Sequence, residues 1–175
     1  MASSSSSPPP PPPSSHHADS SSSFSGKWEY DVFLCFRGDT RHSFTSHLSA
    51  AFRDRQVNFF IDNMLNKTES IDELTSVLKR CALSVVIFSE KFPDSSWCLD
   101  EVATISQSMT KFRHRVLPVF YRVDSSDVSG DSGSYAKTIE RKYGARARSP
   151  EDRKRWMDAL KVVANIAGYT SEAIK

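Results

Sequence analysis

The residues YDVFLCF at positions 30–36 form an apolar run in which no polar side chain interrupts the stretch from Val32 to Phe36. Aromatic and β-branched side chains favour a strand, and a run without alternation is typical of a parallel strand buried on both faces. Outward from it, residues 43–55 carry apolar side chains at helical spacing, and residues 57–61 (VNFFI) predict a second strand. This part of the chain therefore predicts a strand, a helix and a strand.

The same alternation continues toward the end of the sequence. Further strands are predicted at residues 83–88 and 116–121, and further helices at residues 71–81, 96–109, 135–143 and 150–167. Pro150 suits the first turn of the last helix and Gly168 its end, whereas residues 129–134 (SGDSGS) indicate a loop. We expect an α/β fold, with a flavodoxin-like central parallel sheet of four to five strands in the order 2-1-3-4-5, flanked by helices on both faces.

This strand order predicts where a small molecule would bind. Ligands of open parallel sheets bind beyond the carboxyl ends of the strands where the order reverses, here between the first and third strands. The two loops at that point are residues 37–40 and 89–96, and the helix that opens with Trp97 carries Glu101 one turn later. We therefore expect any small-molecule site at that edge of the sheet.

Composition divides the chain into a tail and a domain. Residues 1–26 consist mainly of serine runs and a proline block, and such a segment buries too little apolar surface to offset the entropy of ordering it. We expect residues 1–26 to be disordered and residues 27–175 to form one domain.

Several classes of protein and several locations are disfavoured. No apolar run approaches the length of a membrane span, and the tail lacks the pattern of a signal peptide. Plastid targeting is disfavoured because no Arg or Lys precedes Lys27 and because Asp19 is present. The three cysteines form no CxxC pair, and the net charge of +2 gives no case for a metal, a nucleic acid or a membrane as partner. A cytoplasmic location is favoured, with the nucleus left open.

Five segments in order resemble the Toll/interleukin-1 receptor (TIR) domains of plant immune receptors: YDVFLCFRGDTRHSFTSHL, FFID, LSVVIFSEKFPDSSWCLDEV, VLPVFYRVDSSDV and GSYAKTIERKYG. The resemblance extends from about residue 30 to residue 168. It implies a flavodoxin-like sheet, side-by-side assembly with other TIR domains, and hydrolysis of NAD⁺ in the assembled state. NAD⁺ would be the substrate, and no other cofactor is implied.

The resemblance also implies site residues. Glu101, four residues after Trp97, matches the catalytic glutamate of the family's SSWCLxE segment, and a carboxylate suits a reaction that builds positive charge on a ribose. Arg37 is placed to meet a phosphate, and Trp97 or Phe33 could stack on a ring. The remaining candidate substrate-binding residues are Gly38, Asp39, Thr40, Lys67 and Ser89.

Each of these residues has a simpler interpretation. A glutamate near the start of a helix is commonly a surface residue that complements the helix dipole, and Asp100 is interpreted in that way. A tryptophan at a helix start is more often a packing residue than a ligand contact. Arg37 and Asp39 could instead form a structural salt bridge.

Self-association surfaces are implied by the same resemblance. Ser46 and His47 match a pair used at one helix-to-helix interface, which would meet the last helix around Arg155 and Trp156. A second interface would use the helix that ends at Gly144 together with the last helix. The simpler interpretations are a solvated histidine for His47 and a core anchor for Trp156.

Two departures from the family pattern lie beside the expected site. The family motif FRGEDTR is one acidic residue shorter here, and Lys67 and Thr68 stand where the family carries Arg and Gly. Lysine keeps the charge but loses the bidentate fork of arginine, and threonine lacks glycine's conformational freedom. These changes bear on catalysis and leave open a non-catalytic TIR adaptor or decoy. A phosphoacceptor receiver domain on the same fold is disfavoured because the third strand ends Phe88-Ser89 instead of in an aspartate.

Overall fold

The computed structural model describes residues 28–61, 71–144 and 148–171. Its strands are β1 (Tyr30–Phe36), β2 (Phe59–Ile61), β3 (Cys81–Phe88), β4 (Arg115–Phe120) and β5 (Tyr169–Thr170). Its helices are α1 (Phe44–Asp54), α2 (Ile71–Arg80), α3 (Ser96–Phe112), α4 (Ser125–Ser129), α5 (Ser134–Tyr143) and α6 (Pro150–Ala164). Two short 3₁₀ helices, η1 (Gly38–Thr40) and η3 (Phe92–Asp94), follow β1 and β3.

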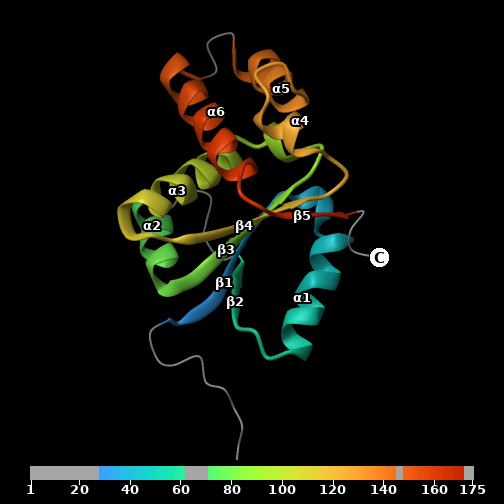
Figure 1. Ribbon diagram of the computed structural model, residues 1–175, viewed down its shortest axis with the longest axis vertical. Coiled ribbons are helices and arrows are strands. Elements are labelled where there is room, and N and C mark those ends of the chain that lie inside the picture. Colours follow the sequence, from blue (N-terminus) through green and yellow to red (C-terminus); the bar gives the residue numbers. More distant parts are fainter. Residues whose placement is uncertain (1–27, 62–70, 145–147, 172–175) are drawn as a thin grey trace, which may run out of the picture.

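The strands form one parallel sheet in the order β2-β1-β3-β4-β5, which confirms the predicted order (Figure 1). β3 is the central strand, and in its pairing with β1 Phe33 lies opposite Ser84 and Cys35 opposite Val86. Because both strands run in the same direction, their carboxyl ends and the loops that follow them meet at one edge of the sheet.

Helices cover both faces, as the alternation predicted (Figure 1). On one face, α1 supplies the side chains of Phe44, Leu48 and Phe52 to a cluster around Leu34 and Ile87. On the other face, α2, α3, α5 and α6 bury a larger cluster. Its largest side chains include Phe33, Phe88, Phe92, Tyr135 and Trp156.

The structure contains short elements that were not predicted, and some element bounds differ from the expected ones. Residues 125–129, for most of which no element was predicted, form α4, and β5 is a two-residue strand that was not predicted. The last helix ends at Ala164 and not at residue 167, so Gly168 lies beyond it, beside β4. Among the residues described, no helix combines the length and the apolar character that a membrane span requires. The tail expected at residues 1–26 lies outside the described residues.

Candidate functional site

Glu101 lies in the second turn of α3, with its side chain turned toward β1. The helix begins at Ser96 because Ser95 caps it, accepting a hydrogen bond from the backbone N–H of Cys98 at 3.3 Å. The thiol of Cys35, the penultimate residue of β1, donates to Oε2 of Glu101 at 3.5 Å. A second thiol, that of Cys98, donates to the carbonyl of Phe36 at 3.7 Å. Glu101 is therefore held beside the carboxyl end of β1.

Burial distinguishes Glu101 from an ordinary helix-surface glutamate. The residue is only 1% exposed, although most charged side chains lie at the protein surface. A carboxylate in such surroundings interacts more strongly with a nearby positive charge than one in water does. The interpretation of Glu101 as a solvated, dipole-compatible residue is therefore wrong for this structure.

The loops after β1 and β3 meet as the strand order predicted. The hydroxyl of Ser89 donates to Oδ1 of Asp39 at 3.2 Å, which links the two loops directly. The hydroxyl of Thr40 donates to the carbonyl of Arg37 at 3.0 Å and lies 2.7 Å from that of Thr45, which fixes the turn into α1. A cavity of about 200 Å³ lies at this edge, lined by Asp39, Ser43, Ser89, Glu90, Tyr121 and Arg122.

Tyr135 of α5 anchors the loop that follows β3. Its hydroxyl donates to the carbonyl of Ser89 at 2.6 Å, and its ring stacks on that of Phe92 with centroids 6.2 Å apart. Burial, followed by the negative charge of Asp39, raises the pKa of Tyr135 well above its usual range. The phenol therefore remains a neutral donor at any physiological pH.

Arg37 is half-buried where β1 ends. Its Nε atom is buried, and among the described residues it has no hydrogen-bond partner. No ion pair between Arg37 and Asp39 is present in the described part of the chain, where the Asp39 carboxylate accepts a hydrogen bond from Ser89. The interpretation of Arg37 and Asp39 as a structural salt bridge is therefore not supported.

The other predicted substrate contacts lie in several different environments. Phe33 is fully buried and stacks on Phe60 with centroids 6.0 Å apart, so the expectation that it stacks on a substrate ring is wrong. Trp97 is half-buried at the start of α3, and Gly38 is exposed, so that a Cβ built on this glycine would meet no atom within 4 Å. Lys67 lies outside the described residues. Glu101 lines neither the cavity at Asp39 nor the one between α3 and α6.

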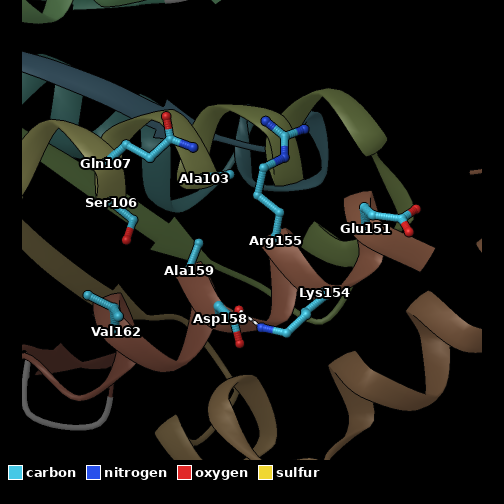
Figure 2. Close-up of a pocket in the computed structure, with 9 residues that line it drawn as sticks. All are labelled: Ala103, Ser106, Gln107, Glu151, Lys154, Arg155, Asp158, Ala159 and Val162. Atoms are coloured by element: carbon cyan, nitrogen blue, oxygen red, sulfur yellow. Dashed lines mark hydrogen bonds and ion pairs between the residues drawn. The ribbon is translucent and has the colours of Figure 1, made fainter. Parts of the chain in front are cut away.

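That other cavity, of about 390 Å³, lies in the groove between α3 and α6 (Figure 2). Ala103 and Ala159 lie on facing sides of the groove, and Val162, which is 48% exposed, lies at one end. Lys154 and Asp158, on its rim, pair with each other at 2.6 Å. Within the described residues, no group of three or more His, Cys, Asp or Glu side chains is arranged to hold a metal ion.

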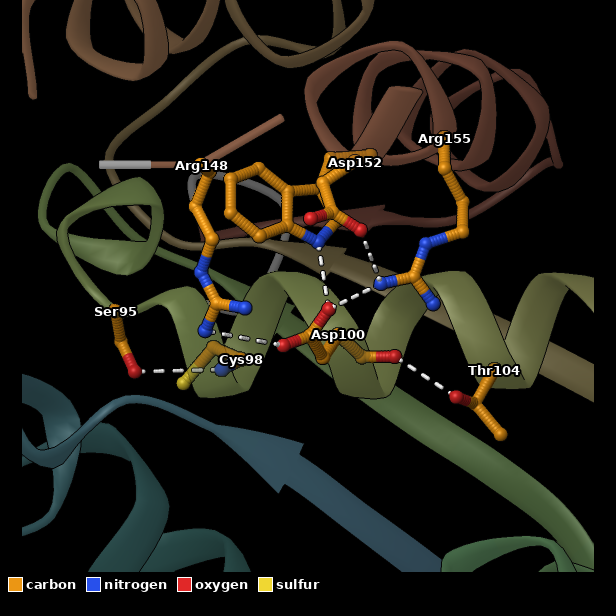
Figure 3. A network of polar contacts seen from close by, with 8 residues as sticks. Ser95, Cys98, Asp100, Thr104, Arg148, Asp152 and Arg155 are labelled. Carbon is orange, nitrogen blue, oxygen red and sulfur yellow. Dashed lines mark hydrogen bonds and ion pairs between the residues drawn. The ribbon is translucent and has the colours of Figure 1, made fainter. Parts of the chain in front are cut away.

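Asp100 is a polar residue whose contacts the sequence did not reveal. Its Oδ1 accepts from Nε1 of Trp156 at 2.8 Å and from Arg155 at 2.5 Å, while Oδ2 lies 3.9 Å from Arg148 (Figure 3). The side chain is 16% exposed. Its partners are 48 to 56 residues away in the sequence, so no local pattern could have indicated them.

The proposed interface residues fall into two groups. Ser46 and His47 are exposed on α1, and Gly144 lies at the end of α5. Trp156, by contrast, is fully buried and packs edge-on against Tyr143, so its assignment to a self-association surface is wrong and the core-anchor interpretation is confirmed. Within one chain, α1 and α6 lie on opposite faces of the sheet (Figure 1).

The parallel sheet in the order 2-1-3-4-5, with a buried carboxylate beside β1 on the helix that follows β3, defines a flavodoxin-like α/β domain of the TIR type. The sequence model of the TIR domain matches residues 29–175, and the chain belongs to this family.

Relatives and solved structures agree with this assignment. The chain is 37% identical over 154 residues to the probable disease resistance protein RPP1 of Arabidopsis thaliana and 40% identical over 150 residues to the TMV resistance protein N of Nicotiana glutinosa. These matches cover 87% and 84% of this chain, which spans only 13% of the length of either relative. The TIR domains of the activated Roq1 resistosome, which directly recognises the pathogen effector XopQ, superpose with a TM-score of 0.72 at 38% identity, covering 82% of this chain and 88% of that one.

Proposed function

We propose that this chain is a signalling module of plant immunity that self-associates and, once assembled, hydrolyses NAD⁺ to nicotinamide and ADP-ribose products. The observation that carries the proposal is the position of Glu101, a buried carboxylate held against the carboxyl end of β1 by the Cys35 thiol. The similarity of the chain to disease-resistance proteins supports the signalling role. The proposed partners are other TIR domains, and the proposed location is the cytoplasm, with the nucleus left open. The thiols of Cys35, Cys81 and Cys98 suit that reducing compartment.

The chemistry of the reaction suits a single fixed carboxylate. When the bond from ribose to nicotinamide breaks, its electron pair leaves with the nicotinamide nitrogen, and positive charge develops on the ribose. Glu101 would stabilise that charge more in the transition state than in the ground state, because the charge is absent from the ribose beforehand. Water then attacks the anomeric carbon and loses a proton. Nicotinamide departs as a neutral molecule, so no acid residue is required to protonate it.

Arg37 is the proposed contact for the pyrophosphate. It follows β1 directly, and the Nε atom that lacks a partner among the described residues provides a donor for an anion. Trp97, at the start of α3, is half-buried and remains the proposed ring contact for the substrate. Because Glu101 is 1% exposed, the site must open before a ribose reaches it, and we propose that association with a second TIR domain promotes that opening.

A second function is favoured by one specific observation. Glu101 lines neither of the two cavities described above, and its burial is what a structural carboxylate would show. A TIR module that acts only through protein contacts, as an adaptor or decoy, would have this arrangement without using it for catalysis.

The deciding experiment follows NAD⁺ consumption and nicotinamide release by concentrated or tethered protein. We expect Glu101→Ala and Glu101→Gln to lower turnover by roughly 10²-fold or more, because the carboxylate charge is lost. The matched control is Glu29→Gln, which changes an exposed acid beside Arg80 where β1 and β3 begin. Turnover that survives in both Glu101 variants would reject Glu101 as the catalytic group, and no turnover by self-associated wild-type protein would favour the adaptor.

A further inference from the structure

The carboxylate of Asp100 joins α3 to α6 (Figure 3). It accepts the indole N–H of Trp156 at 2.8 Å and a guanidinium N–H of Arg155 at 2.5 Å, and Arg148 lies 3.9 Å away. Arg155 also approaches Asp152 at 3.5 Å, which orients the guanidinium along α6. One acidic side chain on α3 thus accepts hydrogen bonds from two residues of α6 and forms an ion pair with Arg148 in the segment before that helix.

These contacts restrict the direction of Asp100 strongly. The side chain is 16% exposed and Trp156 is fully buried, so the ion pairs and the hydrogen bond are partly shielded from water. A buried indole N–H has few alternative acceptors, and a variant that leaves it without one should show the penalty of a buried, unsatisfied donor. Asp100 therefore points toward α6 in any arrangement that keeps the core packed.

The direction of Asp100 determines the direction of the next residue. Consecutive side chains of an α-helix project about 100° apart, so rotation of α3 about its axis would turn Asp100 and Glu101 together. With Asp100 directed at α6, Glu101 faces β1, where it meets the thiol of Cys35 at 3.5 Å. The two contacts lie on adjacent residues and on different sides of the helix.

We propose that Asp100 is a positioning residue that fixes the rotation of α3 and thereby aims the Glu101 carboxylate at the carboxyl end of β1. The inference rests on the proposed role of Glu101 in NAD⁺ cleavage. Apolar side chains of both helices, among them Ala103 and Ala159, belong to one core cluster, so we expect α3 and α6 to stay packed without the carboxylate. The rotation of α3, more than its attachment to α6, is what Asp100 controls.

The kinetic test compares Asp100→Ala with Asp100→Asn. Asparagine keeps an oxygen that accepts from Trp156, so we expect it to retain turnover within about threefold, whereas alanine lowers kcat for NAD⁺ by roughly 10²-fold through misplacement of Glu101. KM should change little in both variants, because neither substitution removes a proposed substrate contact. If Asp100→Ala does not fold, Trp156→Phe, which removes only the N–H donor and part of the ring, replaces it with the same expected direction.

A spectroscopic test reports on the geometry without any need for turnover. The S–H stretching band of Cys35, assigned by its loss in Cys35→Ser, shifts to higher frequency when its hydrogen bond to Glu101 weakens. We expect this shift in Asp100→Ala and its absence in Asp100→Asn. A folded Asp100→Ala protein with an unchanged band would overturn the proposal, as would unchanged kcat. If wild-type protein has no NAD⁺ turnover, the proposed function fails, while the band still decides whether Asp100 orients Glu101.

Discussion

His114 is a buried base in the connection between α3 and β4. Its Nε2 atom lies 2.7 Å from the hydroxyl of Ser84 in the middle of β3, and the residue is 6% exposed. Burial lowers the pKa of His114 from 6.5 to about 4, because the charged imidazolium loses its hydration. The unfolded chain therefore binds more protons than the native one between pH 6.5 and about pH 4.

The first prediction follows from this difference in proton binding between the unfolded and the native chain. The contribution of neutral His114 to the free energy of unfolding should be complete above pH 6.5 and should decline as the pH falls toward 4, by up to about 3 kcal/mol. Urea unfolding of wild-type protein and of His114→Asn at several pH values measures it, since only the difference between the two isolates this histidine. The variant should show the shallower dependence. The exposed His47→Asn is the matched control, and an equal slope in all three proteins would contradict the prediction.

Gly168 illustrates a close backbone approach. A Cβ built on this glycine would lie 2.4 Å from the carbonyl oxygen of Pro118 in β4, closer than real Cβ atoms come to backbone. We expect Gly168→Ala to lower the free energy of unfolding by about 1–3 kcal/mol, because β4 or the chain after α6 has to shift. Gly38→Ala, where nothing lies within 4 Å, should change it by less than about 0.5 kcal/mol. Equal unfolding midpoints for the two variants would show that the β4 contact tolerates a methyl group.

At the scale of elements, the sequence predicted those helices and strands that are long enough to show a hydrophobic period or an apolar run. The run from Tyr30 to Phe36 became β1 with the expected bounds, since an uninterrupted apolar segment has few uses outside a buried strand. β5 has only two residues, both exposed, so neither a period nor a run could indicate it, and its pairing with β4 defines it. The same limit applied to α4, which is a single short turn of helix.

Some features of the candidate site could likewise be predicted from the sequence, and others could not. Asp39 and Ser89 could be placed together because strand order alone brings the loops after β1 and β3 to one edge. Glu101 could be placed beside β1 from the family motif, but its nearly complete burial could not, because it depends on packing against distant residues. Phe33 was misassigned because strand residues alternate between faces, and the sequence did not show which face of β1 met the larger core.

The exposed surface of α1 carries the prediction for self-association. Ser46 and His47 are exposed, and the Ser46 hydroxyl donates only to the carbonyl of Ser43 at 2.8 Å among the contacts described. Ser46→Ala combined with His47→Ala should therefore leave the unfolding midpoint nearly unchanged while weakening association. Light scattering over a concentration series measures the mass, with Lys79→Ala on the surface of α2 as control. Identical mass curves for the double variant and the parent would remove α1 from the interface.

At the scale of the whole molecule, the two faces of the sheet are unequal. α1 packs on one face, while α2, α3, α5 and α6 enclose the larger core on the other. Glu101 lies on the side of the larger core, and the cavity at Asp39 opens near the start of α1. A neighbouring domain that binds along α1 would therefore contact the edge where the loops after β1 and β3 meet, close to the proposed phosphate contact Arg37.

The last prediction concerns how turnover depends on concentration. Because Glu101 is 1% exposed in the single chain and is proposed to be uncovered by association, NAD⁺ turnover per mole of chain should rise with protein concentration and level off once association is complete. The Ser46→Ala, His47→Ala double variant should reach the same plateau at higher concentration, and fusion to a tetrameric scaffold should restore its activity at low concentration by raising the effective concentration. Initial rates over a wide series of protein concentrations, measured beside scattering mass, test this. Turnover per mole that is constant across that series would mean that one chain opens its own site, so association would serve signalling without serving catalysis.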